Sequence, residues 1–506
     1  MKTLAANMGF TLQLAGGLML PSIVAGLALE ETAHVVSLFC AATAFLFLGF
    51  LLNSLAEKRR LDVGQAAFLV AATFLVLSLI GAVPYFISVF GEGNILERVA
   101  NAFFESVSGY TTTGFSFIPD EAVLPISIQI YRVTTEFVGG IGLVFLLLAF
   151  LHTDTAVSGL ESALGTEEIG AFSPRKKYFE IFSVYTIYIV ALSATLYFVG
   201  YKSILRNVMH IIHLITGGYA SSPQFLPGYL QGAGLVVALL TMFIGAISFV
   251  FHHRLITGKL ARLISWEVVL FGAIVAGGAF SLASQAGGFL SGLFQALSFS
   301  SGTGISLVPL SSYGEYGKLV LIVLMFIGGC GFSMAGGIKV SRLIFAARGV
   351  VEMVVRYVKG AVPSENSSYE TRAGRERTAE NLSALVSISL GVILTISSAV
   401  LLMLFLGAGF FDSLFETVSA YSTTGATGGL VSVANPVWMK LLFSGLMLLG
   451  RIDLVVFLIA IGYFAYSLSS RGTGPGEKYL VEVSRFTEGE NAPVAKRGAE
   501  KGPSRL

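Results

Sequence analysis

The sequence predicts an all-α membrane protein of about ten transmembrane helices and four re-entrant loops, arranged as a fourfold pseudosymmetric repeat. Three observations carry this prediction: the composition, the spacing of apolar runs and an internal repeat. Of the 506 residues, 54% are hydrophobic and only 12% are charged, and the mean hydropathy is +0.79. Soluble domains carry about twice that share of charged residues. Lipid is therefore the expected surrounding for most of the chain.

Ten apolar runs approach the length of roughly 20 residues that a helix needs to cross a bilayer. They lie near 9–29, 36–54, 67–90, 128–151, 180–200, 233–251, 267–286, 317–335, 382–406 and 437–467. The first run follows Lys2 and shares features with a secretory signal peptide. We expect a membrane helix instead, because Phe10 to Leu29 is longer than a usual signal-peptide core and contains Pro21. The second run closes an N-terminal hairpin.

The basic residues are distributed unevenly, and such residues mark the cytoplasmic side of membrane proteins. With the N-terminus inside, 25 of the 32 Lys and Arg residues fall on the cytoplasmic side of the ten-span topology. The outer loops are expected to hold only Arg98, Arg132, Lys202, Arg206, Lys318 and Lys440. Arg451 is left inside a span. This asymmetry supports the predicted topology.

Comparing the chain with itself reveals a repeat. Phe104-Glu-Ser-Val-Ser-Gly-Tyr-Thr-Thr-Thr-Gly114 aligns with Phe415-Glu-Thr-Val-Ser-Ala-Tyr-Ser-Thr-Thr-Gly425, with eight of eleven positions identical. A weaker copy runs from Phe294 to Gly304, and the weakest ends at Ile215-Thr-Gly-Gly218. Each copy is too short and too polar to span, and each lies between runs that are long enough. The repeated unit is therefore helix, pore loop, helix.

The repeat and the charge pattern together give seven expected segments. They are an N-terminal hairpin (1–62), pore repeats at 63–155, 156–258, 259–348 and 382–470, a cytoplasmic loop (349–381) and a cytoplasmic tail (471–506).

A second glycine follows each copy in the next helix, at Gly139, Gly245, Gly328 and Gly450. It lies 25, 27, 24 and 25 residues after the last glycine of its loop. This register supports the repeat. Small residues allow membrane helices to approach closely, so we interpret this second set as packing positions.

The first glycine set favours an ion filter. Non-helical backbone at membrane depth is tolerated only where it is buried in protein or lines water, and glycine permits the positive φ angles that turn successive carbonyls to one side. Four such stretches would form rings of carbonyl oxygens that replace the hydration shell of a cation. The expected ion-binding residues are Thr112, Thr113, Gly114, Thr216, Gly217, Gly218, Gly302, Thr303, Gly304, Thr423, Thr424 and Gly425. The alternative is simple close packing of helices.

The third unit is expected to interrupt its second helix. Residues 328–337 contain five glycines, and each costs a helix about 1 kcal/mol relative to alanine. An unwound segment below the filter would act as a gate, and a flexible kink without a gating role is the alternative. The gate residues would be Gly328, Gly329, Gly331, Gly336, Gly337, Lys339 and Arg451.

Several polar residues near these segments have expected roles. Arg451 would repel cations below the filter or donate to carbonyls of the broken segment, and the alternative is an ion pair of purely structural value. Glu105 and Glu416 are expected to hydrogen-bond the backbone of their own loops. His210 and His213, which replace small and apolar residues of the first copy, are expected to pack.

With these motifs the chain resembles the Trk/Ktr/HKT superfamily of cation transport subunits, and its N-terminal hairpin makes it similar to the TrkH/TrkG branch. The resemblance covers about residues 5–470 and rests on four stretches. They are Ser108 to Gly114, Ser419 to Gly425, Gly328 to Lys339 and Leu449-Gly-Arg451. This chain departs from the family pattern at Phe332-Ser333-Met334, where the family usually has Gly-Ser-Thr, and in the second loop, which lacks the Ser/Thr pair.

The resemblance implies selectivity for potassium, since a glycine in every pore loop accompanies it in the family and a serine in the first loop is associated with sodium transport. It also implies a homodimer with one pore per protomer, a cytosolic nucleotide-binding regulatory subunit of the TrkA type, and the plasma membrane of a prokaryote, which is the inner membrane in a Gram-negative cell. K⁺ is the expected transported ion, held at the filter residues, and no organic cofactor is expected on this chain.

The sequence therefore favours potassium uptake, by gated conduction or by flux coupled to another cation as in a symporter. Sodium or poorly selective monovalent cation transport is a rival function, and a receptor or scaffold that moves no ions is another. No Walker loop, Rossmann fingerprint or catalytic triad is present in the sequence, so an enzyme is not expected. The expected partners include the lipid bilayer, and nucleic acid is not among them.

Overall fold

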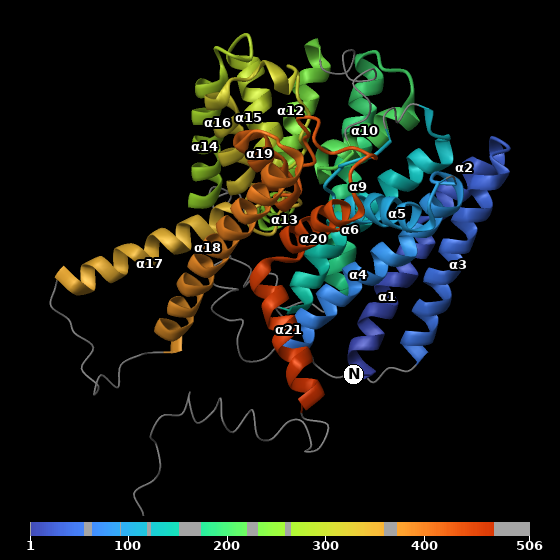
Figure 1. Cartoon of the computed structure of the whole chain (residues 1–506), viewed down its shortest axis with the longest axis horizontal. Coiled ribbons are helices and arrows are strands. Elements are labelled where there is room, and N and C mark those ends of the chain that lie inside the picture. Colours follow the sequence, from blue (N-terminus) through green and yellow to red (C-terminus); the bar gives the residue numbers. More distant parts are fainter. Residues whose placement is uncertain are drawn as a thin grey trace, which may run out of the picture. The chain divides into compact units, whose positions relative to one another are not determined.

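The computed structural model describes residues 2–54, 63–91, 93–118, 123–150, 174–219, 231–258, 265–358 and 372–469. The regular elements in these ranges are helices (Figure 1). The chain divides into two compact units, residues 1–460 and 461–506, and the boundary falls inside the last described helix, Leu454–Ser469. The loops and their supporting residues belong to the first unit. The predicted cytoplasmic tail 471–506, residues 359–371 of the predicted cytoplasmic loop and the first part of the predicted second pore repeat, residues 156–173, lie outside the described residues.

Three helices form the N-terminal hairpin: α1 (Lys2–Leu18), α2 (Leu20–Ala28) and α3 (Thr32–Ser54). Pro21 lies in the first turn of α2, where its missing N–H leaves no intrahelical bond unmade. Gly9 of α1 and Gly49 of α3 bring the two backbones so close that a methyl group on Gly9 would meet the Gly49 carbonyl. Leu12, Met19 and Phe45 are buried in one core cluster of these helices.

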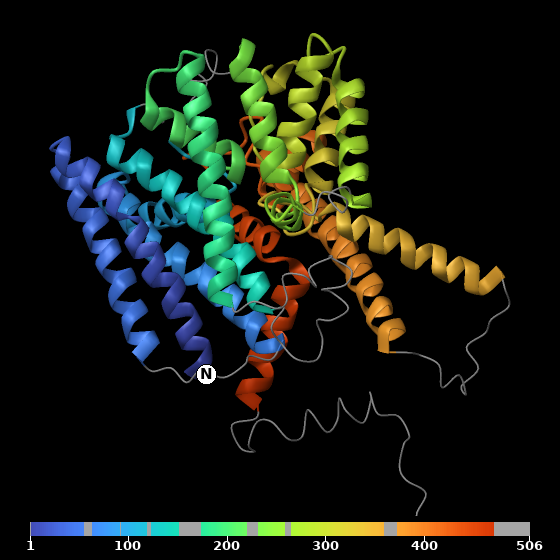
Figure 2. The same cartoon turned by 180° about the vertical axis from the view of Figure 1, so that it is seen from behind.

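The order long helix, short helix, second helix then recurs four times (Figures 1 and 2). The first two units consist of α4 (Val63–Ser88), α5 (Ile95–Tyr110) and α6 (Ile126–Phe150), then α9 (Pro174–Val199), α10 (Ile204–Thr216), α12 (Gly232–Ala246) and α13 (Phe249–Ile256). The last two consist of α14 (Trp266–Leu282), α15 (Phe289–Ser301), α16 (Glu315–Ile327) and α17 (Val340–Val358), then α18 (Arg372–Leu406), α19 (Phe410–Tyr421), α20 (Val437–Ile452) and α21 (Leu454–Ser469). A 3₁₀ turn, η3 (Leu310–Ser312), precedes α16.

The short helices α5, α10, α15 and α19 contain 16, 13, 13 and 12 residues. At 1.5 Å per residue they extend about 18–24 Å, less than the ~30 Å hydrocarbon core of a bilayer. Their C-terminal halves are almost completely buried among the other helices. Large apolar side chains instead face outward from the long helices, such as Phe47, which is 70% exposed, and Phe280, which is 80% exposed.

The second helix is interrupted in three units rather than only in the third. The break between α16 and α17 was predicted from the glycines. The runs 233–251 and 437–467 were expected to be continuous, and this is wrong: α12 and α13 meet at 105°, and one residue, Asp453, separates α20 from α21. Polar caps explain both breaks. Ser248 accepts from the N–H of Val250 at 3.3 Å, and Asp453 accepts from the N–H of Val455 at 3.0 Å.

These breaks bear on the number of membrane spans. Five described helices are long and apolar enough to cross a membrane, and the number rises to seven if each bent pair counts as one span. The 17-residue α14 and the halves of the broken helices are shorter than the roughly 20 residues of a full span. The figure of about ten spans stays a prediction. Residues 349–358 and 372–381 of the predicted cytoplasmic loop are helical, in α17 and α18.

Candidate functional site

Three of the four loops leave their short helices with the same backbone geometry. In each loop the residue two positions before the last glycine is left-handed: φ is 56° at Thr112, 82° at Gly302 and 51° at Thr423. The last glycines are also left-handed, with φ of 82° at Gly114, 70° at Gly304 and 71° at Gly425. Threonine in this region costs about 1 kcal/mol or more. Such strain persists where the surroundings enforce it, often at functional sites.

The second loop has a different geometry. Thr216 is the last residue of α10, and the positive φ angles fall on the next two residues, 69° at Gly217 and 144° at Gly218. Both values lie in the region that favours glycine. The second loop, which lacks the Ser/Thr pair of the family pattern, therefore also differs from the other loops in its backbone conformation.

The four loops contact one another in a closed ring. A methyl group placed on Gly114 would collide with the backbone of Gly218 in the second loop, and one on Gly217 would meet the carbonyl of Gly302 in the third. In the same way, a methyl on Gly304 would collide with the carbonyl of Thr424 in the fourth loop, and one on Gly425 with the carbonyl of Thr113 in the first. Glycine is thus required for the packing of each loop on the next. The structure brings the twelve predicted filter residues together.

Hydroxyl groups and backbone bonds fix three of these loops. The pairs Thr111–Thr113, Ser301–Thr303 and Ser422–Thr424 join their hydroxyl oxygens at 2.7, 2.8 and 2.8 Å. The N–H groups of Thr113, Thr303 and Thr424 each donate at 2.9 Å to a serine carbonyl in the preceding helix. Among the hydrogen bonds of the described residues, none is accepted by the carbonyls of residues 112–114, 217–218, 302–304 or 423–425. The loop N–H groups of these three units donate within their own unit, and the hydroxyl of Thr303 also donates to the Leu214 carbonyl of α10 at 3.4 Å.

A polar side chain nine residues before the last glycine supports each of these three loops. Glu105 accepts from the N–H of Phe117 at 2.6 Å and from the hydroxyl of Ser116 at 3.0 Å. Glu416 accepts from the N–H of Gly428 at 2.7 Å and from Thr427 at 2.8 Å. The prediction for these two glutamates is confirmed. Gln295 occupies the same register in the third loop, and its amide hydrogen-bonds to the hydroxyl of Ser306.

The second glycine set lies directly against the short helices. A methyl group on Gly139, Gly245 or Gly450 would collide with the carbonyl oxygen of Tyr110, Ile215 or Tyr421, respectively. Each of these carbonyls belongs to one of the last residues of a short helix. The packing interpretation is confirmed for these three glycines. Gly328 is different, because it lies in the break after α16 and faces the backbone of Gly336.

The predicted broken segment connects α16 to α17, and four of its residues have positive φ: Gly328, Phe332, Gly337 and Lys339. It lies beside the fourth loop, because a methyl group on Gly336 would collide with the Ser422 carbonyl and the Thr423 hydroxyl. It also joins α12, where the N–H groups of Cys330 and Met334 donate to the carbonyls of Ala246 at 2.9 Å and Gly245 at 3.1 Å.

Charged side chains of two helices hold this segment, and a third charged side chain lies within it. Arg451 of α20 is 3% exposed and donates to the carbonyls of Met334 at 2.8 Å and Gly139 at 3.2 Å. Glu267 of α14 accepts from the N–H of Gly331 at 2.5 Å. Lys339 donates to the carbonyl of Ala335 within the segment. The donation predicted for Arg451 is therefore present. Asp453 pairs with Arg342 of α17.

Comparison with known proteins identifies the family. A family model described as TrkH, cation transport protein, matches residues 36–267 and 260–462. The chain belongs to this family of cation transport proteins. It is accordingly a multi-pass membrane protein and a transporter rather than an enzyme.

Relatives of this TrkH-family chain match it along most of their length. An uncharacterized cation transporter of Methanocaldococcus jannaschii is 28% identical over 426 residues, covering 82% of this chain and 86% of that protein. The Trk system potassium uptake protein TrkH of Halomonas elongata is 27% identical over 421 residues, covering 76% and 83%. The crystal structure of the potassium transporter TrkH from Vibrio parahaemolyticus covers 90% of this chain and 98% of its own, with a TM-score of 0.74 and 20% identity. It shows the same fold.

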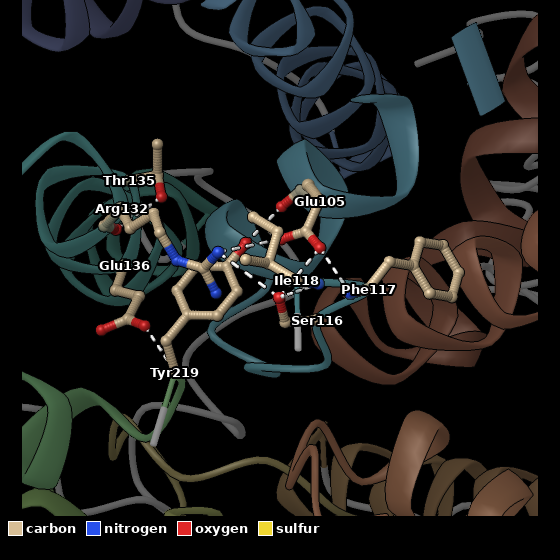
Figure 3. A network of polar contacts seen from close by, with 8 residues as sticks. All are labelled: Glu105, Ser116, Phe117, Ile118, Arg132, Thr135, Glu136 and Tyr219. Atoms are coloured by element: carbon tan, nitrogen blue, oxygen red, sulfur yellow. Dashed lines mark hydrogen bonds and ion pairs between the residues drawn. The ribbon is translucent and has the colours of Figure 1, made fainter. Parts of the chain in front are cut away.

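A buried polar network joins the first and second loops of this TrkH-family protein (Figure 3). Arg132 of α6 pairs with Glu105 at 3.3 Å, and its guanidinium lies 3.5 Å from the ring centre of Tyr219. The hydroxyl of Tyr219 donates to the backbone carbonyl of Glu105. One turn further along α6, Glu136 accepts from the N–H of Tyr219 at 2.5 Å and bonds to His213 at 2.6 Å.

The sequence prediction missed most of this network. Arg132 was assigned to an outer loop, yet it lies in α6 and is 2% exposed. His213 was expected to pack, and it instead hydrogen-bonds to Glu136. One signal was present in the sequence: Arg132 and Glu136 stand four residues apart in an apolar run. Charges inside membrane helices are costly and usually face partners within the bundle.

Proposed function

We propose that this chain mediates potassium uptake through a selectivity filter formed by the backbone carbonyls of its four loops. The observation that carries the proposal is the closed ring of contacts among Gly114, Gly217, Gly304 and Gly425 and their neighbours. Rings of carbonyl oxygens replace the hydration shell of K⁺ in potassium channels. The names of several relatives, Trk system potassium uptake proteins, support the choice of ion.

The surroundings of the ring fit a cation rather than an anion. Four short helices end at the loops, and a helix C-terminus carries partial negative charge. The loop N–H groups donate within their own units, so they do not point at an ion. The loop carbonyls accept no hydrogen bond from the described residues and are available to coordinate a cation. In a membrane, such backbone must be buried in protein or line water. We therefore interpret the loops as re-entrant and their shared centre as the conduction path.

We further propose that residues 328–337, together with Lys339 and Arg451, form the gate. Gly336 lies against Ser422 and Thr423, so the segment closes one side of the fourth loop. Its N–H groups are held by α12 and Glu267, and its Met334 carbonyl by Arg451. Opening would release these bonds as the segment moves away from the fourth loop, a local rearrangement of the kind that switches proteins between two states.

The partners and location follow from the family resemblance. We propose a homodimer in the plasma membrane of a prokaryote, the inner membrane if that cell is Gram-negative, with a cytosolic nucleotide-binding subunit of the TrkA type as regulator. The N-terminal hairpin and the four pore repeats, with the boundaries that the sequence suggested, remain part of this proposal. Gated conduction and flux coupled to another cation both use the same filter.

A second candidate function is sodium or poorly selective monovalent cation transport. The second loop favours it, since Gly217 and Gly218 replace the hydroxyl-bearing pattern of the other loops and its backbone differs from theirs. In such a filter the carbonyl oxygens of the second loop are positioned differently from those of the other three loops, which would weaken discrimination between potassium and sodium.

Ion flux into proteoliposomes tests the proposal. With the purified chain reconstituted at equal protein density, we expect potassium uptake to exceed sodium uptake by about tenfold or more, corresponding to ~1.4 kcal/mol of discrimination. Protein-free liposomes give the leak. Equal potassium and sodium uptake would favour the poorly selective transporter, and uptake no faster than the leak would favour a protein that moves no ions.

A further inference from the structure

The second loop lacks both supports that the other loops obtain from their own chain segment. Its positions corresponding to the bridging hydroxyls are Ile215 and Gly217, which have no hydroxyl group. Nine residues before Gly218, where the other loops have Glu105, Gln295 and Glu416, it has an apolar residue, Met209. Its path must therefore be fixed by another part of the molecule.

Glu136 of α6 lies where that support is needed. Its side chain is fully buried, and one carboxylate oxygen accepts from the N–H of Tyr219, the residue directly after the loop glycines, at 2.5 Å. The other oxygen bonds to Nδ1 of His213 in α10 at 2.6 Å. A methyl group on Gly218 would collide with the carboxyl group of Glu136. The carboxylate therefore contacts the loop at its last glycine and ties both the loop and its short helix to α6.

We propose that Glu136 is the positioning residue that sets the second loop of the filter and thereby its discrimination between potassium and sodium. This inference rests on the proposed function. The loop is the site of the chain's departure from regular filter geometry, and Gly218 is also the residue on which Gly114 of the first loop packs. A shift of Gly218 therefore moves two of the four sides of the ring.

The neighbouring contacts make this position sensitive. Tyr219 is held from two directions: its N–H donates to Glu136, and its hydroxyl donates to the carbonyl of Glu105 behind the first loop. Arg132, one turn before Glu136 on α6, pairs with that same Glu105. Figure 3 shows these side chains as one cluster around the Tyr219 ring. Helix α6 thus carries one support for each of two adjacent loops, and a buried N–H left without its acceptor is strongly unfavourable.

Potassium and sodium uptake in proteoliposomes tests the role of Glu136. For Glu136→Ala we expect the ratio of potassium to sodium uptake to fall about tenfold, because the N–H of Tyr219 loses its acceptor and Nδ1 of His213 loses its hydrogen-bond partner. The ratio is informative because a loss of folded protein lowers both uptakes equally. Glu136→Gln keeps one oxygen that accepts from the N–H of Tyr219, and its amide N–H can donate to Nδ1 of His213 in the tautomer that leaves this nitrogen unprotonated. We therefore expect it to keep a ratio within about twofold of the unsubstituted chain.

Two further variants complete the test. Thr134→Val, on the same helix, removes a hydroxyl that bonds only to the Ile130 carbonyl in the described structure, and we expect an unchanged ratio. If Glu136→Ala does not yield folded protein, Glu136→Asp withdraws the carboxylate by one methylene, and we expect about a threefold fall in the ratio.

The outcomes separate this inference from the proposed function. An unsubstituted chain without potassium preference would contradict the proposed function. A selective unsubstituted chain whose Ala or Asp variant is equally selective would overturn the role of Glu136 alone. A Gln variant as unselective as the Ala variant would overturn positioning by hydrogen bonds, since it would assign the effect to charge.

Discussion

Replacing Gly114 with serine is expected to lower the ratio of potassium to sodium uptake by about tenfold or more, a loss of ~1.4 kcal/mol of discrimination. Gly114 has a φ of 82° and touches the backbone of Gly218 so closely that a Cβ atom has no room. A serine must either leave the left-handed region or push the second loop outward. Both responses displace carbonyl oxygens. Uptake of the two ions by the reconstituted variant measures the effect.

Gly445→Ser is the matched control for this substitution. Gly445 lies in α20, and a methyl group there would meet no atom within 4 Å. We expect its uptake ratio to equal that of the unsubstituted chain. A Gly114→Ser variant that retains full potassium preference would mean that the first loop does not contribute to selection, and the filter interpretation would fail at that loop.

Replacing Arg451 should raise potassium flux. Arg451 donates to the carbonyls of Met334 in the broken segment and Gly139 in α6, and hydrogen bonds from charged groups contribute about 1.5–3 kcal/mol each. Removing the guanidinium in Arg451→Gln weakens the arrangement in which the segment lies beside the filter. We expect the initial rate of potassium uptake to increase by about tenfold, equivalent to ~1.4 kcal/mol. Proteoliposome uptake at equal protein density measures it.

Arg451→Lys distinguishes the two roles that the sequence left open for this residue. Lysine keeps the positive charge but lacks the planar fork of donors that reaches two carbonyls. If Arg451 acts by holding the segment, the lysine variant should also show raised flux. Flux as low as in the unsubstituted chain would instead indicate an electrostatic barrier to cations. Arg348→Gln, which removes a 3.1 Å pair with Glu380 between α17 and α18, should leave flux unchanged.

The sequence predicted the parts of the fold that are repeated. Glu105 and Glu416 could be assigned to their loops because both stand in the same eleven-residue motif and loop N–H groups follow at the same distance. The break after Ile327 was predictable because glycine weakens helices through backbone entropy. The ring of loop contacts follows from the loop glycines. Each of them marks a position where the backbone of the neighbouring loop comes so close that a Cβ atom would not fit.

The parts that were missed depend on contacts between distant segments. Asp453 caps α21 locally, but it also pairs with Arg342, more than one hundred residues earlier. The His213–Glu136 bond joins residues 77 positions apart, and no motif connects them. Ser248 separates two helices, but apolar residues lie on both sides of it in the sequence. Hydropathy alone therefore indicated one continuous helix. Periodicity detects helices, whereas such side-chain partners emerge only when the helices are packed.

Locating the ion directly is the most decisive measurement. Crystals of the protein grown with thallium in place of potassium would reveal the ion by its anomalous scattering. We expect a peak at the centre of the ring formed by Gly114, Gly218, Gly304 and Gly425, within coordination distance of loop carbonyls from all four units. A peak elsewhere in the chain, or no peak between these loops at saturating thallium, would contradict a filter built from their backbone oxygens.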